Sequence, residues 1–311
     1  MTKLIAEFCQ NHNGKIEILE KMIISAKNNG ATHAKIQGLY SHELTKRNQF
    51  ESPENIIFRP HAAEVLRLSK LDLSEENERW FVQKCEELSI IPMITVFSHS
   101  GVERAKRAGF KSIKIASYDC GSLAIIDKVM EFAMEIVIST GATHWDEIKK
   151  TAELLHNKKR KHQKIAFLHA RTIYPTPLSQ SGLLRMCALT SFGFPTGFSD
   201  HTKPEETQLI ASKCSIVLGA EYIERHFTIL GKNETKDGPI SITPTELLEL
   251  YNFAKLSKID QLNSLPTSLF EEVLLCDSLE PTQQEKLNRE YYRGRVASNF
   301  GGRTVYSWEK I

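Results

Sequence analysis

The chain has 311 residues, enough to bury the core of one large domain, and its formal net charge of +2 excludes a global field that would recruit nucleic acid. Its hydrophobic content of 41% excludes a disordered chain, and its six cysteines form no CxxC pair, which argues against a thiolate zinc site. Neither a signal peptide nor an apolar run of membrane-spanning length is visible, so we expect a cytoplasmic protein with reduced thiols and no membrane contact.

Short apolar runs alternate with longer amphipathic stretches along the chain, and each pair predicts a strand followed by a helix. The first strand is predicted at 4–7, and the helix at 16–29 ends at Gly30. A strand at 34–37 precedes a long connection, after which Ser74 caps the next helix. The remaining elements are predicted as strand 91–95, helix 101–108, strand 112–116, helix 123–134, strand 136–139, helix 145–156, strand 165–169, helix 179–191, strand 195–199, helix 204–214, strand 222–226 and helix 244–256.

This rhythm predicts an α/β fold, a (β/α)8 TIM barrel, because such barrels place eight strand–helix units in roughly 250 residues. An open doubly wound sheet is the alternative, but the chain lacks the glycine-rich phosphate loops typical of that fold. We predict a catalytic barrel over residues 1–258. Residues 259–311, with helical patterns at 267–276 and 282–292, are expected to form a short extension that packs on the barrel.

The carboxyl ends of all eight predicted strands carry polar residues. In a parallel barrel these ends meet at one face, and active sites lie there. A chance scatter would put some of the polar groups at the opposite ends. The pattern therefore predicts one active site built from Glu7, Lys35, Gln37, Thr95, Lys114, Ser117, Ser139, His169, Ser199, Asp200, His201, Glu224 and His226.

Two lysines, Lys35 and Lys114, interrupt otherwise apolar strands. A buried ammonium group is costly unless it meets an anion. Two of them pointing inward indicate a multiply charged ligand, such as one with a phosphate and a carboxylate. The alternative is a pair of internal salt bridges to Glu7 or Glu224. A Schiff-base lysine, as in a class I aldolase, is a further alternative for either one.

Two histidines, His201 and His226, fall at the ends of neighbouring strands. Neutral imidazoles there can ligate one divalent ion, and Asp200 and Glu224 are close enough in sequence to orient the rings or to ligate directly. Two nitrogens with oxygens suit manganese, magnesium or cobalt better than structural zinc. A satisfied core histidine is the alternative for either residue alone.

Seven short segments then form a recognisable series between residues 3 and 258. They are Ala6-Glu7-Phe8-Cys9-Gln10-Asn11-His12-Asn13-Gly14, Ala34-Lys35-Ile36-Gln37, Lys114-Ile115-Ala116-Ser117, Ile138-Ser139-Thr140-Gly141, Tyr174-Pro175-Thr176-Pro177, Ser199-Asp200-His201-Thr202 and Ile223-Glu224-Arg225-His226-Phe227-Thr228. In this order and spacing they resemble the N-acetylneuraminate (sialic acid) synthase family.

The resemblance implies a transferase that condenses phosphoenolpyruvate with an aldose into a nonulosonic 2-keto-3-deoxy sugar acid, with C–O cleavage and phosphate release. It implies that His201 and His226 hold a divalent ion, expected to be manganese, that acts as a Lewis acid on the aldehyde. It also implies that Glu7 handles the water that adds at carbon 2. The implied substrate-binding positions are Lys35, Gln37, Thr95, Phe97, Lys114, Ser117, Ser139, Thr172, Tyr174, Ser199, Asp200 and Asp237.

The chain departs from the family on the sugar side. The family's C-terminal antifreeze-like domain, which completes a dimer and supplies an arginine, would begin about where this chain stops, so a homodimer stays open. The family's usual Gly-Pro-Asp is rearranged to Lys236-Asp237-Gly238-Pro239, and Ala170-Arg171-Thr172 replaces its usual Cys-Thr-Ser or Cys-Thr-Asn. The aldose, expected to be an N-acyl amino sugar, therefore stays open. We hypothesise that Arg293, Arg295 or Arg303 folds over the barrel mouth in place of the missing arginine.

Two other functions remain as alternatives. One is a barrel lyase that joins pyruvate to an aldehyde through a Schiff base on Lys35 or Lys114. The other is a non-catalytic barrel that binds a sugar phosphate without turning it over.

Overall fold

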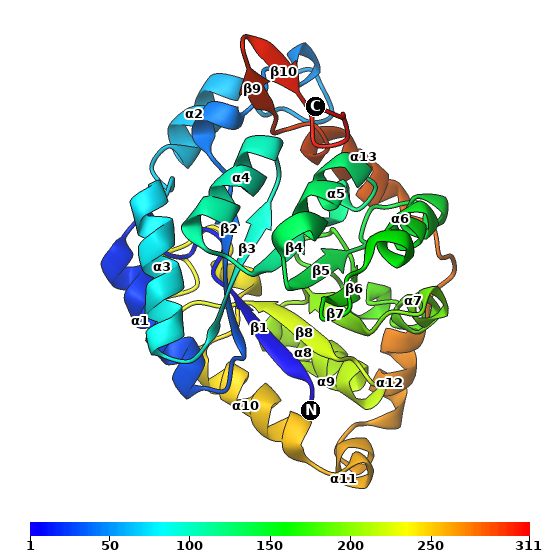
Figure 1. Cartoon of the computed structure of the whole chain (residues 1–311). Helices are drawn as coiled ribbons and strands as arrows, with labels where there is room; N and C mark the ends of the chain where they lie inside the picture. The colour runs from blue at the N-terminus through cyan, green and yellow to red at the C-terminus, as the bar shows by residue number, and fades with distance from the viewer.

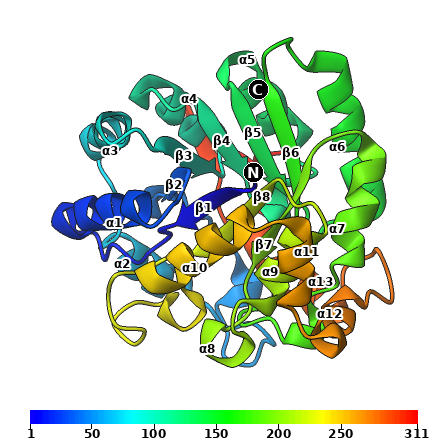
Figure 2. The same ribbon diagram turned by 90° about the horizontal axis from the view of Figure 1, so that it is seen from below.

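The computed structural model describes all 311 residues and has a closed barrel of eight parallel strands at its centre. The strands are β1 (Lys3–Glu7), β2 (His33–Gly38), β3 (Ile91–Val96), β4 (Ser112–Ile115), β5 (Glu135–Ser139), β6 (Lys164–Ala170), β7 (Thr196–Asp200) and β8 (Tyr222–His226). Each strand pairs with its neighbours in sequence, and β8 closes the ring on β1. Figure 2 shows this ring from below, with helices around it. The predicted (β/α)8 fold is confirmed.

Helices cover the outside of the barrel and follow the strands in the predicted alternation. They are α1 (Ile16–Asn28), α2 (His61–Leu68), α3 (Glu75–Glu87), α4 (His99–Ala108), α5 (Leu123–Phe132), α6 (Trp145–Lys158), α7 (Leu184–Leu189), α8 (Pro204–Thr207), α9 (Ile210–Val217) and α10 (Pro244–Lys255). The cap expected at Ser74 forms, because its hydroxyl accepts a hydrogen bond from the Asn77 N–H at 3.1 Å.

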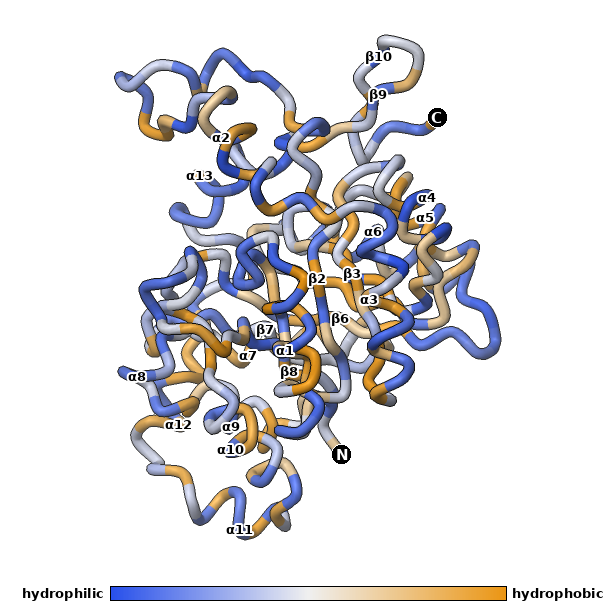
Figure 3. The backbone as a smooth tube through the Cα atoms, turned by 90° about the vertical axis from the view of Figure 1, so that its left-hand side faces the viewer, coloured by the Kyte–Doolittle hydropathy of each residue, from blue (hydrophilic) through white to orange (hydrophobic).

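Two apolar cores lie on either side of the barrel wall. The larger one, of 55 buried residues, fills the space between strands and helices, and Figure 3 shows hydrophobic residues along β3 in the interior. The smaller one, which includes Ile5, Val137 and Tyr222, fills the inside of the barrel near its base. Since side chains alternate along a strand, β8 points Tyr222, Glu224 and His226 inward at successive levels. Polar groups can therefore sit above a closed apolar floor.

Three parts of the chain differ from the prediction. The helix predicted over 179–191 is reduced to α7, with 3-10 turns at Leu178–Gln180 and Thr190–Phe192. The helix predicted over 204–214 is wrong in its middle, because Gln208 and Leu209 adopt φ values of 48° and 63°. That left-handed backbone cannot continue a right-handed helix, so α8 and α9 are separate. The long connection after β2 contains the unpredicted α2, whose Glu64 pairs with Arg295 from the far end of the chain.

After α10 the chain climbs one side of the barrel, from the end that holds the N-terminus to the opposite end (Figure 1). Its elements are α11 (Lys258–Asn263), α12 (Thr267–Leu274), α13 (Gln283–Tyr292) and a hairpin of β9 (Ser298–Phe300) and β10 (Arg303–Val305). The Leu183 N–H donates to the Val273 carbonyl at 2.9 Å, which fastens α12. Buried Glu285 fastens α13 by pairing with Arg171 at 3.0 Å. This segment therefore reaches the carboxyl ends of the barrel strands.

None of the helices combines the length and the apolar character that crossing a membrane requires.

Candidate active site

A cavity of about 530 Å³ opens at the carboxyl ends of the strands, where the sequence predicts the site. It gathers predicted residues from seven of the eight strands and from the loops that follow them. Those that line it are Glu7, Lys35, Gln37, Thr95, Phe97, Lys114, Ser117, Ser139, Tyr174, Ser199, His201, His226 and Asp237. One face of the barrel therefore collects these side chains, as the alternation of polar strand ends predicts.

A buried cage of two lysines and two carboxylates forms the floor of the cavity. The Lys35 ammonium contacts Glu7 and lies 3.1 Å from Glu224, and the Lys114 ammonium lies 3.2 Å from the same Glu224 carboxylate. All four side chains are at most 6% exposed. The internal ion pairs considered from the sequence are thus present, and both lysines also face the cavity.

The two lysines differ in charge state. Burial lowers the pKa of Lys114 to about 8, and nearby Lys35 adds to this, although Glu224 opposes it. Burial also acts against a charged Lys35, but Glu224 and Glu7 outweigh it and raise the pKa of Lys35. In turn Lys114 and Lys35 hold the pKa of Glu224 far below its usual range despite burial. Lys35 is therefore a fixed cation, while Lys114 titrates near neutral pH.

Hydroxyl groups surround the cage. Ser139 accepts from the Lys114 ammonium at 2.7 Å, and Thr95 accepts from that of Lys35 at 3.2 Å. Ser199 donates to Glu224 at 2.7 Å. With the carboxylates, these short side chains occupy all three N–H groups of Lys35 and two of the three of Lys114, so one N–H of Lys114 has no protein partner.

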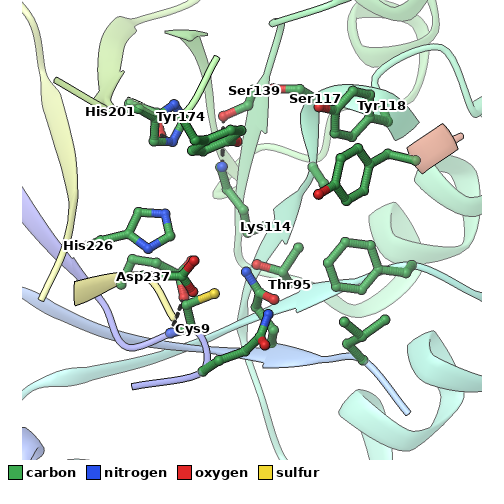
Figure 4. A pocket seen from close by; sticks show the side chains of 18 of the residues that line it. Cys9, Thr95, Lys114, Ser117, Tyr118, Ser139, Tyr174, His201, His226 and Asp237 are labelled. Atoms are coloured by element: carbon green, nitrogen blue, oxygen red, sulfur yellow. Dashed lines mark hydrogen bonds between the residues drawn. The ribbon is translucent and has the colours of Figure 1, made fainter. Parts of the chain in front are cut away.

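A second corner of the cavity brings together three possible metal ligands, Cys9, His226 and Asp237. One donor atom from each lies within 4.8 Å of the others. Figure 4 shows them together on one side, across the cavity from Lys114 and Ser139. His226 Nδ1 and Asp237 Oδ2 are buried and have no hydrogen-bond partner. Because unpaired buried polar atoms are costly, these residues fit a divalent cation.

His201, the other predicted ligand, lies beside this corner rather than in it. Its ring centroid is 5.6 Å from that of His226, and its Nδ1 donates to the Arg171 carbonyl at 2.7 Å. Burial, helped by His226, lowers the pKa of His201 to about 3. The ring is therefore neutral with Nδ1 protonated, and its Nε2 carries a lone pair that lies 3.4 Å from the Ser199 hydroxyl.

Asp200 and Thr172 do not line the cavity, although both are predicted to bind substrate. The Asp200 carboxylate makes no hydrogen bond to either histidine ring. It points to the other side of the barrel wall, where its carboxylate lies 2.7 Å from Arg225 and accepts from the Thr202 N–H at 2.8 Å. Thr172 is buried under α13, where its N–H donates to Glu285 at 3.2 Å. Both residues support the site from outside.

Glu224 also has a different position from the one expected beside the histidines, because it binds the two lysines. It lines the cavity, as the sequence predicts, and so does Cys9, which is not among the predicted site residues. Cys9 lies in the turn after β1 and has a φ of 44°, so the alternation of a strand does not fix the direction of its side chain.

The mouth of the cavity is built from segments that carry no strand signal. Arg59 comes from the long connection after β2, Lys236 from the loop after β8, and Tyr292 and Arg295 from the last segment of the chain. Among the three tail arginines, Arg295 reaches the cavity, whereas Arg293 pairs with Glu147 and Arg303 lies near Glu309 at the surface.

Known proteins share both the sequence and the fold. The sequence profile of the NeuB family matches residues 22–261. The N,N'-diacetyllegionaminic acid synthase of Campylobacter jejuni is 29% identical over 248 residues, which cover 79% of this chain and 73% of that protein. An uncharacterized protein of Methanocaldococcus jannaschii is 30% identical over 257 residues, which cover 82% and 70%.

A solved structure shows the same architecture. The N-acetylneuraminic acid (sialic acid) synthetase of Leptospira borgpetersenii, crystallised with citrate, superposes with a TM-score of 0.70 at 23% identity over 93% of this chain and 90% of that one. The family profile covers most of the barrel, and the resemblance seen in the seven segments is confirmed. The chain belongs to the NeuB family, in which its named relatives are sugar-acid synthases.

Proposed function

We propose that this protein is a phosphoenolpyruvate-dependent condensing synthase that converts an aldose into a nonulosonic 2-keto-3-deoxy sugar acid. One observation carries the proposal: a buried cage of two lysines adjoins a corner of unpartnered metal-ligand atoms in a single cavity. A dianionic three-carbon acid and an aldehyde can then be held side by side.

The lysine cage is the proposed phosphoenolpyruvate site. The phosphate and carboxylate of this substrate would pair with Lys114 and Lys35, and the hydroxyls of Ser117 and Ser139 would donate to the phosphate. Gln37, Thr95 and Phe97 line the same end of the cavity and would limit how the three-carbon unit lies. Buried ammonium groups that are already fixed bind anions without reorganisation, which favours the transition state.

The metal corner is the proposed aldehyde site. Asp237, His226 and Cys9 would hold a divalent ion there, with His201 as a further nitrogen donor from the neighbouring strand. We propose manganese, with magnesium or cobalt as alternatives, since imidazole and carboxylate donors suit these ions. When bound, such an ion supplies Lewis acidity to the aldehyde carbonyl. Burial and the Asp237 carboxylate raise the pKa of the Cys9 thiol, so ligation through this sulfur would release a proton.

The reaction balances as phosphoenolpyruvate plus aldehyde plus water giving the keto acid plus phosphate. Carbon 3 of phosphoenolpyruvate forms the new C–C bond, and the carbonyl oxygen becomes a hydroxyl. The cation that develops at carbon 2 takes up water, whose proton passes to Glu7. The C–O bond to phosphate then breaks and leaves the ketone. The Glu7 carboxylate, held by Lys35, also stabilises that cation electrostatically.

A phosphate-release assay tests the proposal. Free aldoses are screened with phosphoenolpyruvate and manganese, and the products are identified by mass spectrometry. We expect phosphate only when phosphoenolpyruvate, an aldose and a divalent ion are all present, with a product mass equal to the two substrates plus water minus phosphoric acid. Full activity in excess chelator would refute the role of the metal.

A Schiff-base lyase is the second candidate, and the low pKa of Lys114, about 8, favours it because a neutral amine is the nucleophile in such enzymes. Borohydride added with pyruvate would then trap a covalent adduct on Lys114. The condensing synthase predicts no adduct, since Ser139 and Glu224 would hold this amine as an ammonium group that pairs with the anionic substrate.

A further inference from the structure

The mouth of the cavity carries more positive charge than the proposed reaction uses. Arg59, Lys236 and Arg295 all line it, above the cage of Lys35 and Lys114. They come from three separate parts of the chain, so their convergence is a property of the fold.

Few carboxylates balance these cations. Glu64 lies 2.7 Å from Arg295 and 2.9 Å from Arg67, so one carboxylate is shared by two guanidinium groups. Lys236 is also within electrostatic range of Arg67, Arg59, Glu64 and Asp237. The four cations Arg59, Arg67, Lys236 and Arg295 thus face two carboxylates, Glu64 and Asp237, and leave a net charge of +2.

Two of the cations have no carboxylate partner. No carboxylate oxygen lies within 4.0 Å of the charged groups of Arg59 and Lys236 in this fold. Arg59 is fixed nonetheless, because its guanidinium donates to the Tyr292 hydroxyl at 3.0 Å and lies 4.8 Å from the centre of the Tyr291 ring. Arg295 is 8% exposed, and its Nε has no partner. Fixed and unpaired donors around a cavity mouth are suited to bind an anion.

The position of these cations indicates which of the two substrates they would contact. Lys236 precedes Asp237, which belongs to the metal corner, so the cations lie on the aldehyde side of the cavity and toward solvent. An aldose whose aldehyde is at that corner would extend its far end toward the mouth. A net charge of +2 there matches a dianionic phosphate monoester better than a neutral hydroxyl or a singly charged carboxylate.

We propose that Arg59, Lys236 and Arg295 bind a phosphate group at the end of the acceptor aldose remote from its aldehyde. The assignment rests on the proposed condensation, and it makes a phosphorylated aldose the substrate class. The last segment of this chain then shapes acceptor choice through Arg295 and through Tyr292, which positions Arg59.

The test compares three acceptors with the same enzyme: N-acetylmannosamine, its 6-phosphate and N-acetylmannosaminuronic acid. Phosphoenolpyruvate consumption gives kcat/KM for each. We expect the 6-phosphate to be the best acceptor. The preference of the enzyme is the ratio of kcat/KM for the 6-phosphate to kcat/KM for N-acetylmannosamine. Lys236→Gln and Arg59→Gln should each lower this ratio by about tenfold, which corresponds to a loss of about 1.4 kcal/mol of binding free energy.

Lys232→Gln is the matched control, because Lys232 lies in the same loop but pairs with Glu205 and does not line the cavity. It should keep the wild-type ratio. The proposal would be overturned by any of three results. These are an unchanged ratio in both test variants, a higher kcat/KM for the uronic acid than for the 6-phosphate, and an effect of the substitutions on the KM of phosphoenolpyruvate alone.

Calorimetry with N-acetylmannosamine 6-phosphate, without phosphoenolpyruvate, separates this proposal from the reaction itself. If no acceptor is turned over but Lys236→Gln weakens binding of the 6-phosphate, the condensation is wrong and the phosphate subsite stands. If turnover occurs and the 6-phosphate binds no better than the free sugar, the subsite is wrong.

Discussion

Glu224→Gln offers the sharpest test of the buried cage. Glu224 is 5% exposed and lies 3.1 Å from Lys35 and 3.2 Å from Lys114. The substitution keeps the shape of the side chain and removes its charge. Lys35 retains Glu7 as a partner, whereas Lys114 loses its only carboxylate within 4.0 Å.

The cost follows from that asymmetry. Removing one partner of a buried ion pair costs about 3–5 kcal/mol, and we expect the lower figure because Lys114 can lose its proton instead. With about 2.1 cal/mol/K of unfolding entropy per residue, a loss of about 3 kcal/mol lowers the Tm of a 311-residue domain by about 5 °C.

The effect of pH has a definite sign. The pKa of Lys114 in the folded wild type, about 8, lies below its ordinary value of 10.5, and losing Glu224 lowers it further. The unfolded state therefore binds more protons, so stability rises with pH. The gap in Tm between Glu224→Gln and wild type should be wider at about pH 6 than at about pH 9, where Lys114 is largely neutral in both.

Thermal unfolding with and without phosphoenolpyruvate provides the assay. Because the phosphate and carboxylate of phosphoenolpyruvate would pair with the two lysines, this ligand should raise the Tm of Glu224→Gln more than the Tm of wild type. Glu221→Gln is the control, since Glu221 pairs with Lys3 at the surface and such pairs contribute about 0–1 kcal/mol. A Glu224→Gln protein as stable as this control, with an equal response to phosphoenolpyruvate, would refute the reasoning.

Three further predictions concern other parts of the molecule. Asp237→Asn should weaken manganese binding at least about tenfold by calorimetry, because it removes a donor oxygen from the corner with Cys9 and His226; equal affinity would exclude Asp237 as a ligand. Glu285→Gln should make α13 more sensitive to proteolysis, because buried Arg171 loses its carboxylate; unchanged cleavage would mean that this pair does not hold the segment. Burial would raise the pKa of Glu135, but hydrogen bonds from His33, Tyr222 and Ser112 outweigh burial and lower this pKa to about 2. The carboxylate therefore stabilises the fold above about pH 4.5 and loses that effect as the pH falls toward 2. The Tm of Glu135→Gln should fall less steeply with acid than the Tm of wild type, and parallel curves of Tm against pH would contradict the lowered pKa.

Much of the site follows from the period of a strand. The strand predicted at 222–226 is β8, and alternation alone puts Tyr222, Glu224 and His226 on one side of the wall. The same rule explains the misplaced Asp200. Ser199 faces the cavity, so its neighbour must face outward, where it meets Arg225 at the paired position of β8.

The rest depends on contacts between distant segments. Helix α2 lies in a connection without a helical pattern long enough to predict it, and its Glu64 is held by Arg295, 231 residues away. The cations of the cavity mouth lie in loops and in the tail, where no periodic pattern fixes the direction of a side chain. For this reason the tail arginines could be suggested as a group from the sequence, but only the fold distinguishes Arg295 from Arg293 and Arg303.

A crystal structure of the protein with manganese and phosphoenolpyruvate would locate the ion by its anomalous signal and so test the proposed site. We expect the ion within bonding distance of His226 and Asp237, with the anionic groups of phosphoenolpyruvate on Lys35 and Lys114. An ion bound away from these side chains, or phosphoenolpyruvate bound at Arg59 and Lys236 instead, would contradict this expectation.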